Sequence, residues 1–215
     1  MDVVFDPRIA GSLLGHFAAA VNGTSVAQGT SFLASSKGKR IFREGIDVID
    51  DPTRPGGLAS RLFDGEGVRP RRLPLTEGGI LANWLLDQTS ANQLGLTNNG
   101  CARRAPGGTP SPSSSNLYLD GGKHTPEELI SDIKEGVYIT EMIGSTINML
   151  TGDYSRGASG FMIRNGQIAE PVAGLTVAGQ LSDMFKNMFA ANDLLFRRSI
   201  NAPTLRIADL MVAGE

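Results

Sequence analysis

A β-hairpin signal in the second half of the chain constrains the fold more than any other feature of the sequence. Asn165-Gly166 separates residues 161–164 from Gln167-Ile168, and both flanking runs are typical of strands. Asn and Gly tolerate the positive φ angles of a type I′ turn, so this pattern predicts two antiparallel strands that meet there. The rest of the chain must therefore build on a sheet.

The segment just before the hairpin is dense in polar residues and glycine. Residues 150–160 read Leu-Thr-Gly-Asp-Tyr-Ser-Arg-Gly-Ala-Ser-Gly. Glycine lets another backbone approach closely, and an extended peptide that joins a sheet needs free backbone groups beside polar side chains. We therefore expect a peptide-binding surface here. Its residues would be Asp153, Tyr154, Ser155, Arg156, Gly157 and Ser159.

Two other readings of this segment remain open. The polar residues and glycines are also typical of a tight turn with a purely structural role. A hydrolytic site that uses Asp153, Ser155 and Arg156 is the third reading, but a serine nucleophile needs a positioned base and none is evident in the sequence. We therefore assign no catalytic residue.

Elsewhere the sequence alternates between short strand patterns and a few helix patterns. Asp6-Pro7 is an N-cap followed by a proline suited to the first helical position, and an apolar stripe at four-residue spacing predicts a helix to about Asn22. Thr125 opens a capping box for a second helix, and residues 180–189 form an amphipathic pattern. Expected strands include residues 3–5, 46–49, 68–75, 80–86, 116–119, 137–143, 175–177, 194–197, 204–207 and 211–213. This pattern predicts an α+β fold, β-dominated, with a mostly antiparallel sheet or barrel-like core and about three short helices.

Composition limits the possible functions. The 215 residues suffice for one domain spanning 1–215, and a net charge of −2 gives no general attraction for nucleic acid. No run of 18 apolar residues and no basic leader is present, so we expect a cytoplasmic protein with no membrane contact. The single cysteine, Cys101, lies beside Arg103 and Arg104 in a loop-like stretch at residues 98–115, and we expect a surface thiol there.

Blocks spread along nearly the whole chain resemble one known family. They are Val4-Phe5-Asp6-Pro7, Gly29-Thr30-Ser31-Phe32-Leu33, Phe63-Asp64-Gly65-Glu66-Gly67, Trp84-Leu85-Leu86-Asp87, Asn116-Leu117-Tyr118-Leu119, Ala202-Pro203-Thr204-Leu205, and above all residues 151–161 and 164–172. In this order they resemble the C-terminal domain of the TldD/PmbA proteins, in the PmbA (TldE) branch, some of which carry the name modulator of DNA gyrase. The resemblance implies that the family's separate N-terminal domain is absent from this sequence.

The resemblance also implies which residues would hold a metal. In TldD-type members a helix carries His-Glu-x-x-x-His, and a later cysteine completes a zinc site. The corresponding helix here reads Ser-Leu-Leu-Gly-His from Ser12 to His16, and residues 196–202 read Phe-Arg-Arg-Ser-Ile-Asn-Ala. We therefore expect no metal in this chain, a packed His16 and a solvated His124.

The resemblance implies a function within a two-chain assembly. We expect a metal-free partner subunit of a TldD/PmbA-type metalloprotease that acts on small or unfolded peptides, with zinc in a TldD-like subunit. The alternatives are a self-sufficient peptidase with an unrecognised site and a stand-alone peptide-binding module, and whether this chain is itself an enzyme stays open. Partners would be the zinc-bearing subunit and a peptide substrate, with self-association also allowed and no nucleic acid.

Overall fold

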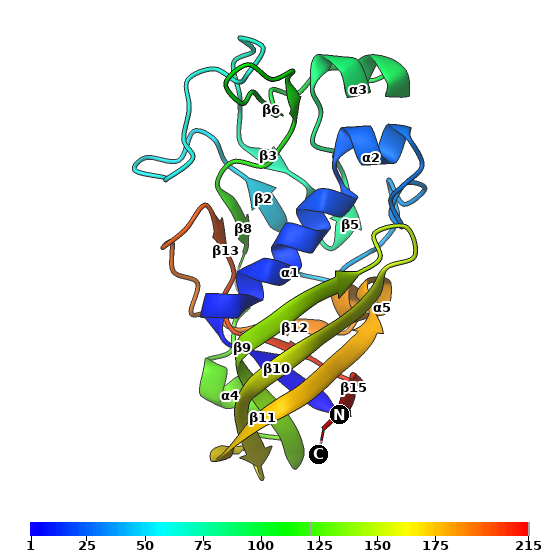
Figure 1. Ribbon diagram of the computed structural model, residues 1–215. Coiled ribbons are helices and arrows are strands. Elements are labelled where there is room, and N and C mark those ends of the chain that lie inside the picture. Colours follow the sequence, from blue (N-terminus) through cyan, green and yellow to red (C-terminus); the bar gives the residue numbers. More distant parts are fainter. Residues whose placement is uncertain (121, 215) are drawn as a thin grey trace.

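A long twisted sheet and a long helix lie against each other at the centre of the molecule (Figure 1). The computed structural model describes residues 1–120 and 122–214, without the side chain of Ser145. In spatial order the sheet holds β12 (Met188–Ala190), β14 (Leu205–Ile207), β1 (Asp2–Phe5), β9 (Glu135–Ile147), β10 (Asp153–Arg164), β11 (Gln167–Gln180) and β15 (Met211–Ala213). Only β1 and β9 run parallel in it, which confirms a mostly antiparallel, β-dominated fold.

Shorter strands build the part of the molecule farthest from the two termini (Figure 1). One sheet has the order β13 (Ile200–Asn201), β8 (Leu117–Leu119), β2 (Val48–Asp50) and β3 (Leu73–Pro74). Two further pairs are β4 (Thr76–Glu77) with β5 (Ile80–Leu81), and β6 (Ala102–Arg103) with β7 (Ser111–Pro112). The helices are α1 (Pro7–Ala20), α2 (Gly23–Ala27), α3 (Gln88–Leu94), α4 (Pro126–Ile130) and α5 (Leu181–Lys186).

The predicted hairpin is confirmed. Asn165 and Gly166 have φ angles of 48° and 77°, as a type I′ turn requires, and Arg164 pairs with Gln167 across the turn. Both pairings of β10, with β9 and with β11, contain register shifts. At each shift the extra residue belongs to β9 or β11, so β10 itself contains no bulge. The side chains of β10 therefore alternate regularly between the two faces of the sheet.

Helix α1 begins where the sequence predicts and covers one face of the sheet. The Asp6 side chain accepts a hydrogen bond from the backbone N–H of Arg8, and Pro7 occupies the first turn. Its apolar stripe, Ala10, Leu13, Leu14, Phe17 and Ala20, is buried in the main core together with β1, β9 and β10. Helix α4 lies on the other face, where Ile130 packs with Val4 and Ile163. The described helices include none that is long and apolar enough to cross a membrane.

The structure differs from the predicted elements in three places. Helix α1 ends at Ala20, before the predicted end near Asn22, and α2 begins at Gly23 because the Asn22 side chain accepts hydrogen bonds from Thr24 N and Ser25 N. The strand expected at 68–75 is reduced to β3, which pairs with β2, and the strand expected at 80–86 is reduced to β5, which pairs with β4. The expected strand at 194–197 is irregular.

Candidate functional site

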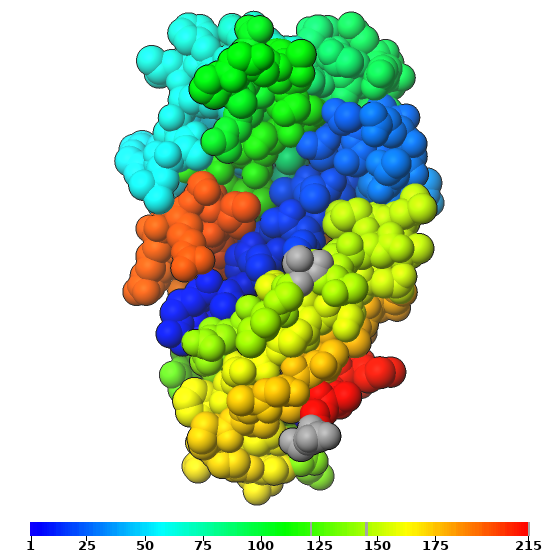
Figure 2. All heavy atoms as spheres, in the orientation of Figure 1, coloured from blue at the N-terminus to red at the C-terminus, as the bar shows by residue number. Residues whose placement is uncertain are grey.

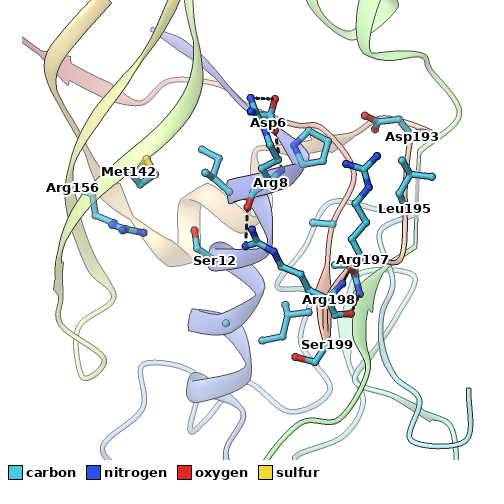
Figure 3. Close-up of a pocket in the computed structure, with 17 residues that line it drawn as sticks. Asp6, Arg8, Ser12, Met142, Arg156, Asp193, Leu195, Arg197, Arg198 and Ser199 are labelled. Atoms are coloured by element: carbon cyan, nitrogen blue, oxygen red, sulfur yellow. Dashed lines mark hydrogen bonds and ion pairs between the residues drawn. The ribbon is translucent and has the colours of Figure 1, made fainter. Parts of the chain in front are cut away.

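An open cavity of about 890 Å³ runs along the exposed side of α1, and we call it the α1 groove. Its floor is the first half of α1, including Gly11, Ser12 and Gly15. One wall comes from Met142 of β9 and Arg156 of β10, and the other from residues 193–202 (Figure 3). In Figure 2, α1 is visible as a blue diagonal band between the orange residues near 195 and the yellow-green strands.

Two glycines one helical turn apart keep the floor of the groove low. A Cβ on Gly11 would lie 3.2 Å from the carbonyl oxygen of Ile200, so this glycine lets the second wall approach the helix. A Cβ on Gly15 would meet nothing within 4 Å. Glycine inside a helix costs about 1 kcal/mol relative to alanine. Gly15 therefore lowers the intrinsic stability of the helix but leaves the space above the helix open.

Both carboxylates that line the groove are already engaged. Arg8 pairs with Asp6 through two contacts, Nε–Oδ1 at 2.7 Å and Nη2–Oδ2 at 3.0 Å. Burial alone would raise the pKa of Asp6, but hydrogen bonds from Arg8 and Tyr138 hold it below its ordinary value. Asp193 accepts hydrogen bonds from the backbone N–H and the hydroxyl of Thr204, each at 2.8 Å.

Three other arginines line the groove without a carboxylate partner among the described residues. These are Arg156, Arg197 and Arg198. The Nε of Arg156 donates to the carbonyl oxygen of Gly144 at 2.8 Å, and Nη1 of Arg198 donates to that of Arg8 at 3.3 Å. These contacts orient the guanidinium groups but leave their charge unneutralised, so the groove is electropositive.

Three buried polar atoms lie on α1 and β10. Ser12 Oγ and His16 Nε2 are buried and make no hydrogen bond to the described residues, and Tyr154 Oη is buried close to the guanidinium of Arg156 without a well-aligned hydrogen bond. The His16 and Tyr154 rings pack edge to face, with centroids 6.1 Å apart. Burial, and then the positive charge of Arg156, lowers the pKa of His16, while burial raises the pKa of Tyr154 to about 12. Both side chains are therefore uncharged at neutral pH.

The six residues predicted to bind peptide all lie on β10, but strand alternation divides them. Tyr154 is buried in the core under α1, and Arg156 on the same face lines the groove, pointing toward Ser12 in Figure 3. Ser155, Gly157 and Ser159 occupy the opposite face of the strand. Their role in peptide binding stays a prediction.

Asp153 stabilises the start of β10. Its two carboxylate oxygens accept hydrogen bonds from the Thr151 hydroxyl and the Gln180 amide. No hydrogen bond joins Asp153 to Ser155 in the described part of the chain, and Ser155 and Arg156 lie on opposite faces of β10. This arrangement offers no support for the hydrolytic reading of these three residues.

Sequence reasoning missed most of the groove. It assigned no role to Gly11, Ser12 and Gly15, and it predicted a strand at 194–197, inside the irregular part of the second wall. One local signal was available in Asn201, a few residues after Arg197-Arg198. Its side-chain oxygen accepts hydrogen bonds from the backbone N–H groups of Arg197 and Arg198. An Asn used in this way is typical of a compact turn and not of a strand.

Metal-ligating residues do not converge in the described part of the chain. It contains no cluster of three or more His, Cys, Asp and Glu side chains with metal-ligand geometry. His16 faces Tyr154, and the imidazole of His124 is exposed, 3.7 Å from Glu128. The expected surface thiol was wrong: Cys101 is 3% exposed, and burial raises its pKa to about 12.

Comparison with known proteins gives a consistent result. The model of the family described as PmbA/TldA metallopeptidase C-terminal domain matches residues 1–214. Metalloprotease PmbA of Escherichia coli O157:H7 is 36% identical over 214 residues, which are 99% of this chain and 46% of that protein. A metalloprotease of Methanothermobacter thermautotrophicus is 38% identical over 192 residues, 87% of this chain and 41% of the relative. The chain therefore spans about half the length of these relatives.

Solved structures share the fold. A protein from Thermotoga maritima, described as a modulator of a DNA gyrase, superimposes with a TM-score of 0.90 at 27% identity, over 99% of this chain and 49% of that one. TldE from Thermococcus kodakarensis gives a TM-score of 0.87 at 24% identity, over 99% of this chain and 50% of that one. The second likeness concerns the fold alone.

Proposed function

This chain belongs to the PmbA/TldD metallopeptidase C-terminal domain family, and from that premise we propose that it is a metal-free subunit that holds peptide for a TldD-like, metal-bearing partner. The family description implies a metal. The residues present do not fit one, because α1 offers a single imidazole that faces a tyrosine and a guanidinium.

One observation carries the peptide-holding role: β9 has an unpaired edge beside the groove. Strand β1 pairs with β9 only as far as Ile139, where Asp6 N donates to the Ile139 carbonyl, and the chain then turns into α1. Beyond Ile139, β9 pairs only with β10 among the described strands. Met142 lies on this stretch and lines the groove.

An extended peptide in the groove would use this edge. Unpaired strand N–H and C=O groups form backbone hydrogen bonds with an added strand, whatever the sequence of that strand. The α1 floor would support the peptide from below, and the apolar side chains of Ile9, Met142 and Leu195 would contact its side chains. This mode of binding suits small or unfolded peptides, because it requires an extended backbone.

The test measures metal content and activity with and without the partner. The chain and a TldD-like subunit are purified separately and mixed, the complex is measured by analytical ultracentrifugation, and zinc is measured by elemental analysis. We expect stoichiometric zinc in the partner only, and hydrolysis of a fluorogenic peptide that increases when the chain is added. The partner alone, at the same zinc content, is the control.

Two results would contradict the proposal. Stoichiometric zinc together with peptide hydrolysis by the chain alone would show an independent peptidase. If the partner forms no complex with the chain and its activity is the same with and without the chain, the chain is not a subunit of that enzyme.

A further inference from the structure

We propose that the α1 groove binds a carboxylate group of the peptide through Arg156, Arg197 and Arg198. This inference rests on the peptide-holding function proposed above and adds the chemical group that the site recognises. The α-carboxylate of a peptide C-terminus and the side-chain carboxylate of Asp or Glu share this chemistry.

The charge balance of the groove supports an anionic ligand. Its lining holds four arginines and two aspartates, a surplus of two positive charges. Asp6 is paired with Arg8, and Asp193 is held by Thr204, so neither neutralises the remaining guanidinium groups. The planar fork of a guanidinium matches the two oxygens of a carboxylate and forms charge-assisted hydrogen bonds with it.

The arginines lie on two walls of the same groove. Arg156 belongs to β10 on one side of α1, and Arg197 and Arg198 belong to the segment on the other side (Figure 3). The contacts of Arg156 with Gly144 and of Arg198 with Arg8 use backbone carbonyls, so guanidinium N–H groups remain for a ligand. Arg197 donates only its backbone N–H in the described structure, to Asn201.

The size and lining of the groove favour an organic ligand over a small inorganic anion. A volume of about 890 Å³ lies within the usual range for ligand sites, about 300–1,000 Å³. Ile9, Met142 and Leu195 place apolar surface beside the arginines. A peptide offers carboxylate and apolar side chains together, whereas phosphate offers only charge.

The experiment compares matched peptides by fluorescence anisotropy on the purified chain. An N-terminally labelled hexapeptide of alanine, glycine and leucine is prepared with a free C-terminal carboxylate and as its amide, and a third peptide is amidated and carries one internal glutamate. We expect the plain amide to bind about 10- to 100-fold more weakly than the acid, the effect of losing charge-assisted hydrogen bonds. The third peptide distinguishes the two carboxylate sources.

Variants assign the effect to the groove. Arg197→Gln/Arg198→Gln and Arg156→Gln should each reduce the preference for acid over amide by about tenfold, with their thermal midpoints measured alongside. Arg71→Gln is the control, because Arg71 is exposed and lies outside the groove. This substitution removes one positive charge, as each Arg→Gln substitution in the groove does.

Each outcome has a distinct meaning. Equal binding of acid and amide, or a full preference retained by the folded arginine variants, overturns the carboxylate site and leaves peptide holding intact. No binding of any peptide removes both proposals. Inorganic phosphate and N-acetylglutamate are also compared as competitors of the bound peptide. If phosphate displaces the peptide as effectively as N-acetylglutamate does, the groove binds small anions in general, and the proposal of peptide carboxylate recognition is overturned.

Discussion

Arg198 donates a hydrogen bond from Nη1 to the carbonyl oxygen of Arg8 at 3.3 Å, and thereby joins residues 190 positions apart in the sequence. The contact holds one wall of the α1 groove against the first turn of the helix that forms its floor. The same wall is tied to the core through Asp193 and Thr204. The groove is thus a preformed feature assembled from both ends of the chain.

Replacement of Gly15 should separate stability from binding. Gly15→Ala should raise the free energy of unfolding by about 1 kcal/mol, because alanine has the higher helix propensity and its Cβ meets nothing within 4 Å. Gly15→Leu should fold as well but fill the groove and weaken peptide binding at least tenfold. Urea unfolding and anisotropy measure the two effects. Undiminished binding by Gly15→Leu would place the peptide elsewhere.

Two tyrosines form a matched pair for a stability test. Tyr154→Phe removes a buried hydroxyl without a described partner, so we expect no loss of stability and a gain of up to about 1 kcal/mol. Tyr138→Phe removes the hydrogen bond from Tyr138 to Asp6 Oδ2 at 3.1 Å, so we expect a loss of about 1 kcal/mol. Chemical unfolding compares them. A larger loss at Tyr154 would show that its hydroxyl has a stabilising partner, such as the nearby guanidinium of Arg156.

Asp50 should make stability fall as the pH rises from about 4 to 6. Burial raises the pKa of this carboxyl from 3.8 to about 6, against the hydrogen bonds that it accepts from Ser115. In that window the folded chain still holds the proton and the unfolded chain has released it. Asp50 therefore contributes up to about 3 kcal/mol of stability below pH 4 that is lost by pH 6.

Asp50→Asn is the matched variant for this pH effect, because it retains a side-chain acceptor but cannot titrate. Between pH 4 and pH 6.5 the unmodified chain should lose stability relative to this variant. The unfolding free energy of the variant minus that of the unmodified chain should therefore increase across this range. This comparison cancels contributions of opposite sign from other groups, such as Asp6 and His16, whose pKa values are lowered. A difference that stays constant across the window would show that Asp50 does not titrate there.

Cys101 should be unreactive in the folded chain. Its side chain is 3% exposed, and burial raises its pKa to about 12, so very little thiolate forms at pH 8. A colorimetric disulfide reagent should react at least 100-fold faster in urea than in buffer. Fast reaction in buffer at the rate of a free thiol would restore the surface position that the sequence predicted.

The elements that could be predicted are those that rest on local interactions. Asn165-Gly166 sets its own turn, and Asp6-Pro7 caps the helix that follows directly. The failures concern distant partners: the N–H of Cys101 donates to the carbonyl oxygen of Leu86, which fixes the loop against a buried segment. Leu86 lies outside residues 98–115, so no pattern within that stretch contains this information.

The groove could not be predicted for the same reason. Its arginines come from three separate positions in the chain, Arg8, Arg156 and 197–198, and each pattern by itself is typical of an exposed surface. Only the crossing of α1 between β9 and the segment 193–202 makes them neighbours. The predicted polar run did contain one of them, Arg156.

The regularity of β10 determines where this fold tolerates changes of length. Every register shift beside β10 inserts its extra residue into β9 or β11, so the flanking strands absorb irregularity while the strand between them stays in phase. A residue lost or gained at those bulges would alter sheet curvature but leave Arg156 facing α1. Loss of Ser155, the residue of β10 between Tyr154 and Arg156, would turn the guanidinium to the face opposite the Tyr154 ring. Variation in length among relatives should therefore concentrate in β9 and β11, and spare the strand between them.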